Sequence, residues 1–329
     1  MISILRGRVL ISAFLLCSCL VLSLLTGCRE KRNLVAVVPR TTGTPLWEAL
    51  HAGVADEAAG KDIQIYWNAP PDDADTSDQL DMIGAYKKNR YKGIIFAPID
   101  TMASRSIVLE TIEDHIPVVL IDDVKGEEPN RYLSYVDNDE RIGGKLAAMR
   151  TAKLLRNRGT IAIIGISARV VSTSTREEAF EQALAEIAPQ ITVTVRRFGD
   201  ANVIRQQQVA QEIISSPDHH VDAIIALSAS STRGAFYAKI TAKPRSRILL
   251  IGFDQDLLAP LETGDIDSII AQDTREIGRR AMSNLISQMH GKPTSGVTLV
   301  PPLLITKDNV HSSSISRLWD YQHYDWSRQ

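Results

Sequence analysis

The sequence predicts an α/β protein with two lobes, each a parallel β-sheet covered by helices on both faces. Short runs of β-branched residues alternate with longer amphipathic stretches, which is the pattern of parallel strands connected by helices. The alternation starts again after Gly159, which indicates a second sheet. About 300 residues follow the first apolar stretch, and this is more than one hydrophobic core usually contains.

The elements of the first half follow from these two periods. Leu46, Leu50 and Val54, for example, recur at the spacing of one helix face, whereas Asn33 to Val38 is a short apolar run. The predicted strands are 33–38, 63–67, 93–98, 117–122 and 132–136, and the predicted helices are 45–59, 77–89, 101–115 and 139–156.

The second half repeats the pattern. Its strands are again short apolar runs, and each is followed by a longer stretch with apolar residues at helical spacing. The predicted strands are 160–165, 191–198, 221–227, 247–254 and 266–272, and the predicted helices are 175–188, 203–215, 232–240, 257–262 and 274–289.

Residues 1–27 have the layout of a secretory signal. Arg6 and Arg8 precede an apolar stretch of about 17 residues, and small residues come before Cys28. The ending Leu-Thr-Gly-Cys resembles the bacterial lipobox, which implies cleavage before Cys28 and attachment of lipid to it. The alternative is an uncleaved anchor helix, although the stretch is short for a membrane span. We expect an exported protein anchored in the cell envelope, either in the periplasm or on the outer face of the cytoplasmic membrane.

The composition removes several classes of function. The net charge of −2 gives no reason to expect nucleic acid as a partner. Cys17 and Cys19 lie inside the predicted signal, so only Cys28 remains and no disulfide or cysteine zinc site is predicted. The seven histidines show no metal-binding spacing. We therefore predict no metal and no cofactor.

Polar residues follow the predicted strands, at the end of a parallel sheet where ligands bind. Each residue also has a structural alternative, because Asp, Ser and Thr cap helices, Trp47 could belong to the core, and Arg176 could be an exposed helix residue. The candidate ligand-binding residues are Arg40, Thr44, Trp47, Asp122, Asp123, Arg176, Ser228, Asp254 and Gln272.

Eight stretches, in order and spacing, resemble the periplasmic sugar-binding proteins of ABC importers, the ribose-binding type in particular. They are VAVVPRTTGTPLWEAL, GIIFAPIDT, IPVVLIDD, VDNDERIGGKLAA, STSTREEAF, VDAIIALSA, ILLIGFDQD and SIIAQDTREIGRRA. The resemblance implies the type I fold, two Rossmann-like lobes joined by three crossings. It assigns 28–138 plus 273–301 to an N-terminal lobe and 139–272 plus 302–310 to a C-terminal lobe, and leaves 311–329 as an aromatic-rich tail.

The resemblance also implies roles for five candidates. The family's ligand carboxylates fall on Asp122 and Asp254, its guanidinium on Arg176, its amide on Gln272 and its stacking aromatic on Trp47. Such groups suit a sugar, because hydroxyls both donate and accept hydrogen bonds and the C–H face of a pyranose or furanose packs on an aromatic ring.

The chain departs from this pattern near the predicted site. The ribose binders carry an arginine where this chain has Asp123, a small polar residue near Arg40, and asparagines at Thr44 and Ser228. We interpret the first two changes as a charge pair exchanged across the cleft, with Arg40 facing Asp123. The ligand is then expected to be a monosaccharide other than ribose, a sugar derivative or a cyclitol.

The resemblance implies a monomeric solute-binding lipoprotein that delivers its ligand to an ABC permease in the inner membrane. The alternative is a receptor that presents the ligand to a transmembrane kinase or chemoreceptor, since fold and cleft would be the same. An enzyme is disfavoured because no G-x-S-x-G, P-loop, G-x-G-x-x-G or H-E-x-x-H motif occurs. A transcription factor is disfavoured because an export signal stands where a helix-turn-helix would be.

The tail contains Trp319, Tyr321, Tyr324 and Trp326, beyond the point where the family usually ends. Two alternatives stay open. The tail packs on the C-terminal lobe, or it contacts a partner.

Overall fold

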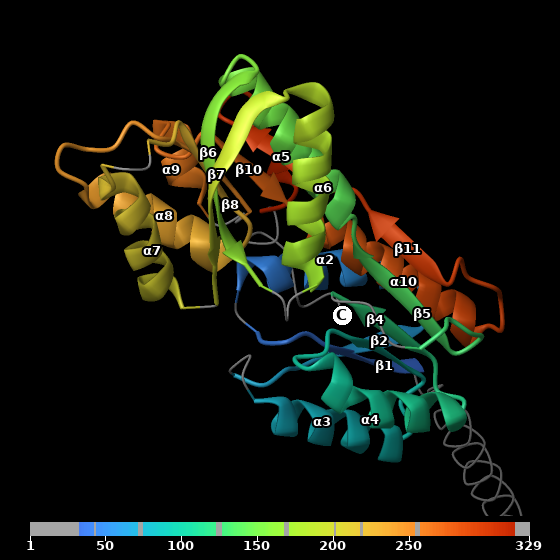
Figure 1. The fold of residues 1–329 in the computed structure, drawn as a ribbon. Helices are drawn as coiled ribbons and strands as arrows, with labels where there is room; N and C mark the ends of the chain where they lie inside the picture. The colour runs from blue at the N-terminus through green and yellow to red at the C-terminus, as the bar shows by residue number, and fades with distance from the viewer. Residues whose placement is uncertain are drawn as a thin grey trace, which may run out of the picture.

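The computed structural model describes residues 33–42, 44–71, 75–122, 127–167, 171–200, 202–217, 220–253 and 257–319. Within these ranges the chain forms two α/β lobes, each built on a six-stranded sheet (Figure 1). The predicted fold class is confirmed. No helix in these ranges has both the length and the apolar character needed to cross a membrane.

The first lobe has a fully parallel sheet with the order β11-β5-β4-β3-β1-β2. Its strands are β1 (Asn33–Val38), β2 (Ile63–Trp67), β3 (Gly93–Phe96), β4 (Val118–Ile121), β5 (Leu133–Asn138) and β11 (Val297–Val300). Helices α2 (Pro45–Ala58) and α10 (Thr274–Met289) pack on one face, and α3 (Thr76–Lys88) and α4 (Thr101–Glu113) pack on the other.

The second lobe has the order β12-β10-β9-β8-β6-β7, and only β12 runs antiparallel to its neighbour. Its strands are β6 (Arg158–Ile166), β7 (Gln190–Phe198), β8 (Ala223–Ala226), β9 (Leu249–Gly252), β10 (Ser268–Ala271) and β12 (Leu303–Thr306). One face is covered by α5 (Glu140–Leu154) and α6 (Val171–Ile187). The other is covered by α7 (Val203–Ser215), α8 (Ala229–Thr241), α9 (Leu258–Thr263) and α11 (Ser313–Ser316).

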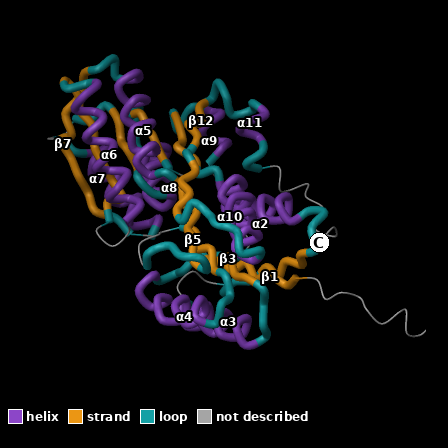
Figure 2. Tube along the Cα trace, turned by 90° about the vertical axis from the view of Figure 1, so that its right-hand side faces the viewer, coloured by secondary structure: helices purple, strands orange, loops and turns teal. Residues whose placement is uncertain are grey.

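The chain passes between the two sheets three times. These crossings run from β5 to α5, from β10 to α10, and from β11 to β12. The Asp139 N–H donates to the Val300 carbonyl at 2.8 Å, which ties the first crossing to the third. Only short segments therefore connect the lobes, and Figure 2 shows the lobes as two bodies with α2 and α10 side by side on one of them.

Capping side chains fix where most of the described helices begin. In each of them an oxygen of the residue before the helix accepts a backbone N–H of the first turn, which would otherwise lack an intrahelical partner. The capping residues are Thr44, Asp75, Asp100, Asp139, Asn202, Ser228 and Asp273.

The sequence did not predict β11, β12 or α11, and α6 begins at Val171, four residues before the predicted start. In the tail, Ile315 and Leu318 are buried in the core of the second lobe. The segment 311–319 therefore packs on the second lobe, which was the first alternative for the tail. Tyr321, Tyr324 and Trp326 lie outside the described residues.

Helices α2 and α10 approach closely because Gly53 has no side chain. A Cβ atom there would overlap the carbonyl oxygen of Arg275, which is backbone and cannot turn aside. We predict that Gly53→Ala lowers the free energy of unfolding by about 1–3 kcal/mol, as overpacking does in cores. Gly84→Ala in α3 is the matched control, since its Cβ would meet nothing within 4 Å. Urea denaturation of both variants would check this, and equal stability would contradict the packing.

Candidate functional site between the lobes

The described candidate residues stand at the carboxyl ends of the two sheets. Arg40 lies two residues beyond β1, Asp122 directly follows β4, and Gln272 directly follows β10. Parallel strands share one direction, so these positions gather at one edge of each sheet. Asp123 and Asp254 lie outside the described residues, and their roles stay predictions.

Arg40 and Asp122 form an ion pair in the first lobe. Arg40 Nη2 lies 3.3 Å from Asp122 Oδ2, and both side chains are partly exposed. The buried Nε of Arg40 has no hydrogen-bond acceptor among the described residues. Arg40 thus pairs with Asp122 here, and the predicted pairing with Asp123 falls outside the described residues.

Asp122 adopts a left-handed backbone conformation with a φ of 58°. Few residues with a side chain adopt this region, although aspartate is among those that tolerate it. Such conformations often occur at functional sites, where the surrounding structure holds them in place. The left-handed conformation of Asp122 after β4 therefore supports its assignment as a candidate ligand-binding residue.

Arg176 is the charged group of the second lobe, and only 6% of it is exposed. Its Nη2 donates to Glu140 Oε1 at 2.7 Å, its Nε donates to Glu140 Oε2, and its Nη1 donates to the Leu227 carbonyl at 2.7 Å. The guanidinium also lies over the ring of Phe253, 4.7 Å from its centroid. Three of its five N–H groups are used in these bonds, so two remain for another acceptor.

Carboxylates of the first lobe lie near this guanidinium. Burial, the largest single influence, lowers the pKa of Arg176, but the carboxylates of Glu140, Asp122 and Asp137 together raise the pKa above its usual value. Asp122 and Asp137 belong to the first lobe, at the ends of β4 and β5. Arg40 and Asp122 are therefore paired in the first lobe, and the Asp122 carboxylate is close enough to Arg176 of the second lobe to raise its pKa.

Two glycines let α5 lie close to α6 and to this region. A Cβ atom at Gly144 would overlap the Arg176 carbonyl oxygen, and one at Gly143 would lie 3.3 Å from the Phe253 ring. Close helix packing places Glu140, in the first turn of α5, beside Arg176 in α6.

Three other candidates have the structural roles that were the alternatives to ligand binding. Thr44 Oγ1 accepts the Trp47 N–H at 3.5 Å, and Ser228 Oγ accepts the Ser231 N–H at 3.2 Å, so both cap helices. Trp47 is 5% exposed and packs in the core of the first lobe, so it does not present a ring face in this structure. Gln272 is partly exposed and makes no side-chain hydrogen bond with a described residue.

The sequence reasoning missed Glu140, Asp137 and Phe253. All three occur in stretches noted for their resemblance, but single residues there were not assigned roles. Acidic residues are common in the first turn of a helix, so the sequence alone does not distinguish Glu140 from an ordinary one. Its partner Arg176 becomes apparent only from the packing of α5 on α6. Within the described ranges, no three His, Cys, Asp or Glu side chains are grouped to hold a metal ion.

The family model described as periplasmic binding protein domain matches residues 35–293. The chain therefore belongs to the periplasmic binding protein family. This confirms the predicted class, an exported binding protein of the periplasm and not an enzyme.

Curated relatives and solved structures agree with this family. The D-allose-binding periplasmic protein of Escherichia coli (strain K12) is 24% identical over 262 residues, which cover 76% of this chain and 83% of the relative. The ribose import binding protein RbsB of Bacillus subtilis (strain 168) is 24% identical and covers 84% of this chain and 88% of its own length.

The fold is shared with an ABC transporter solute binding protein from Agrobacterium vitis bound with alpha-D-tagatopyranose. The two structures have a TM-score of 0.76 and 22% sequence identity, covering 87% of this chain and 98% of the other.

Glu140 neutralises a buried charge, so its loss is predicted to be costly. Glu140→Gln leaves the guanidinium of Arg176 uncompensated, and breaking such a pair lowers the free energy of unfolding by about 3–5 kcal/mol. Glu178→Gln is the control, since Glu178 pairs with Arg141 at 3.7 Å and both side chains are exposed. The control is expected to change stability by less than about 0.5 kcal/mol. Equal melting temperatures for the two variants would refute the role of Glu140.

Proposed function

We propose that the protein captures a monosaccharide, or a related polyhydroxylated small molecule, between its lobes and delivers it to an ABC importer. The main support is that the Arg40–Asp122 ion pair lies at the carboxyl end of one sheet, and that Asp122 raises the pKa of the buried Arg176 in the other lobe. Neither lobe alone supplies both the carboxylate and the buried guanidinium.

The chemistry of these groups suits hydroxyl ligands. A carboxylate such as Asp122 accepts from sugar hydroxyls, and the remaining N–H groups of Arg176 donate to their oxygens. The buried Nε of Arg40 would gain an acceptor from a ligand oxygen, and an unmet buried donor is costly, at about 1–3 kcal/mol. Asp123, Asp254 and Gln272 are proposed to complete the site.

The names of the relatives support this class of ligand. Two relatives are named for binding or importing D-allose and ribose. Two solved neighbours contain bound D-arabinose and D-fucose. Because the identities are near one quarter, and the chain carries Arg40 and Asp123 in this region, we propose a sugar or derivative other than ribose.

Closure of the lobes would follow from binding. A ligand that contacts both lobes stabilises their closed arrangement, and a membrane permease then recognises that shape. A dissociation constant in the micromolar range corresponds to about −8 kcal/mol. A few charge-assisted hydrogen bonds, about 1.5–3 kcal/mol each before ordering costs, supply that free energy. We propose that the protein works as a monomer.

Loss of the Asp122 carboxylate is predicted to weaken binding without unfolding the protein. Isothermal titration against pentoses, hexoses, uronates and cyclitols identifies the sugar, and Asp122→Asn should then bind it about 10–100-fold more weakly. Asp114→Asn is the control, because Asp114 is an exposed carboxylate that pairs with Lys87 at the opposite end of the sheet. The proposal fails if no compound of any class binds, or if both variants bind as the unmodified protein does.

Lipid on Cys28 is proposed to anchor the protein. Metabolic labelling with a radioactive fatty acid should label the protein, and Cys28→Ser should remove the label and release the protein from the membrane fraction. Cys19→Ser, inside the predicted signal, is the control and should keep both. Label that persists in Cys28→Ser would contradict the lipobox.

A further inference from the structure

Residues 307–319, here called the C-terminal segment, follow the last strand of the second lobe. Asn309 closes the turn after β12, since its Oδ1 accepts the Thr306 N–H at 2.8 Å and its Nδ2 donates to the Leu304 carbonyl at 2.9 Å. Ile315 and Leu318 then enter the core beneath α7, α8 and α9. The C-terminal segment is therefore fixed to the second lobe.

Arg317, in the same segment, reaches the first turn of α10. Its Nη2 contacts Asp273 Oδ2, and its Nε donates to the Ser314 carbonyl at 3.0 Å, which holds the side chain toward α11. The Arg317 carbonyl also accepts from Arg275 Nη1 at 3.4 Å. Asp273 is 3% exposed, and its other oxygen accepts the Glu276 N–H at 3.2 Å as the cap of α10.

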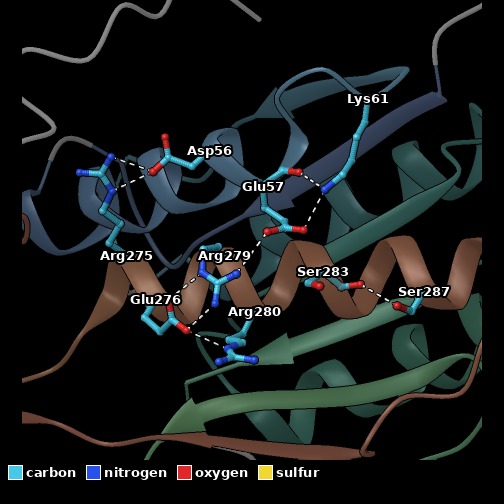
Figure 3. A network of polar contacts seen from close by, with 9 residues as sticks. All are labelled: Asp56, Glu57, Lys61, Arg275, Glu276, Arg279, Arg280, Ser283 and Ser287. Carbon is cyan, nitrogen blue, oxygen red and sulfur yellow. Dashed lines mark hydrogen bonds and ion pairs between the residues drawn. The ribbon is translucent and has the colours of Figure 1, made fainter.

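Helix α10 is tied to the first lobe by its contacts with α2. Arg275 Nη2 contacts Asp56 Oδ2 of α2 at 2.7 Å, and Arg279 Nη1 lies 3.4 Å from Glu57 Oε2. Figure 3 shows these ion pairs crossing from α10 to α2, with Glu276 between Arg279 and Arg280. The pairs add to the close packing at Gly53, so the first turn of α10 is fixed to the first lobe.

Arg317 consequently joins the lobes beside the second crossing, where β10 leads into α10. Arg317 provides both an ion pair and a carbonyl acceptor from the second lobe to the first. Each end of the contact makes one further hydrogen bond, Arg317 to the Ser314 carbonyl and Asp273 to the Glu276 N–H. The guanidinium belongs to the second lobe and the carboxylate caps α10 on the first, so a rotation of one lobe against the other acts on this contact.

We propose that the Arg317–Asp273 contact holds the lobes in the arrangement of this structure and thereby lowers the affinity for a ligand that draws them together. In this arrangement Asp122 and Arg176 have no direct bond to each other among the described contacts. A contact formed in this state and strained by closure stabilises this state, and a ligand has to overcome that difference. Arg317 acts on affinity through the hinge and does not touch the ligand.

Single-molecule energy transfer on the ligand-free protein tests this directly. Dyes are attached through azide-bearing residues at Met102, in the first turn of α4, and Ile204, in the first turn of α7, both strongly exposed at the carboxyl ends of the sheets. Arg317→Gln should move molecules to higher transfer efficiency. Because this measurement uses no ligand, its outcome is independent of the proposed sugar function.

Two further variants guard against a loss of folding. Asp273→Asn with Arg317→Gln keeps a helix-capping side chain and removes the unpaired buried carboxylate, and it should give the same shift. Arg245→Gln is the control, since it breaks an exposed pair with Asp265 inside the second lobe. In titrations with D-allose, or with whichever sugar the screen identifies, both Arg317 variants should bind about 3–10-fold more tightly. Transfer efficiency equal to or below that of the control overturns the proposal.

Discussion

The direction of parallel strands is the constraint on which the rest of the structure depends. All strands of a parallel sheet have their carboxyl ends on the same side, so the residues that follow the strands lie near one another whatever their separation in sequence. Asp122, which follows β4 of the first sheet, raises the pKa of Arg176 in the helix after β6 of the second sheet, so the carboxyl ends of the two sheets lie near each other. The helices that cover both faces bury the strands and leave the carboxyl ends of the strands free for polar groups.

The two arginines near the carboxyl ends of the sheets, Arg176 and Arg40, are held in different ways. Arg176 is nearly enclosed, and a bidentate pair with Glu140 satisfies its charge while Phe253 supports its plane. Arg40 is more exposed and makes a single contact of 3.3 Å with Asp122. The second lobe thus presents a rigid guanidinium, whereas the first lobe presents a pair that can rearrange around a ligand. This division suits a site in which one wall is fixed and the other adapts as the lobes close.

Much of the fold could be predicted because the long periodic segments carry strong signals, as the match of 203–215 and 274–289 with α7 and α10 shows. Strands β11 and β12 were missed because Pro301-Pro302 between them resembles a loop, and because β11 is partly exposed and so lacks the apolar run of a buried strand. The positions at strand ends were predictable from topology, but Glu140 was not, since its partner is 36 residues away and only the packing of α5 on α6 joins them. Thr44, Trp47 and Ser228 each had a capping or core position as an alternative in the sequence, and the local geometry decides for that alternative.

Binding of one ligand by both lobes is the basis of the proposed function. A crystal structure of the protein grown with the sugar that it binds would show which residues hold the ligand. We expect a single sugar whose hydroxyls contact Asp122 from the first lobe and Arg176 from the second, with the lobes closer together than in the ligand-free protein. A sugar held by residues of one lobe alone, with Asp122 and Arg176 directed away from it, would refute binding by both lobes.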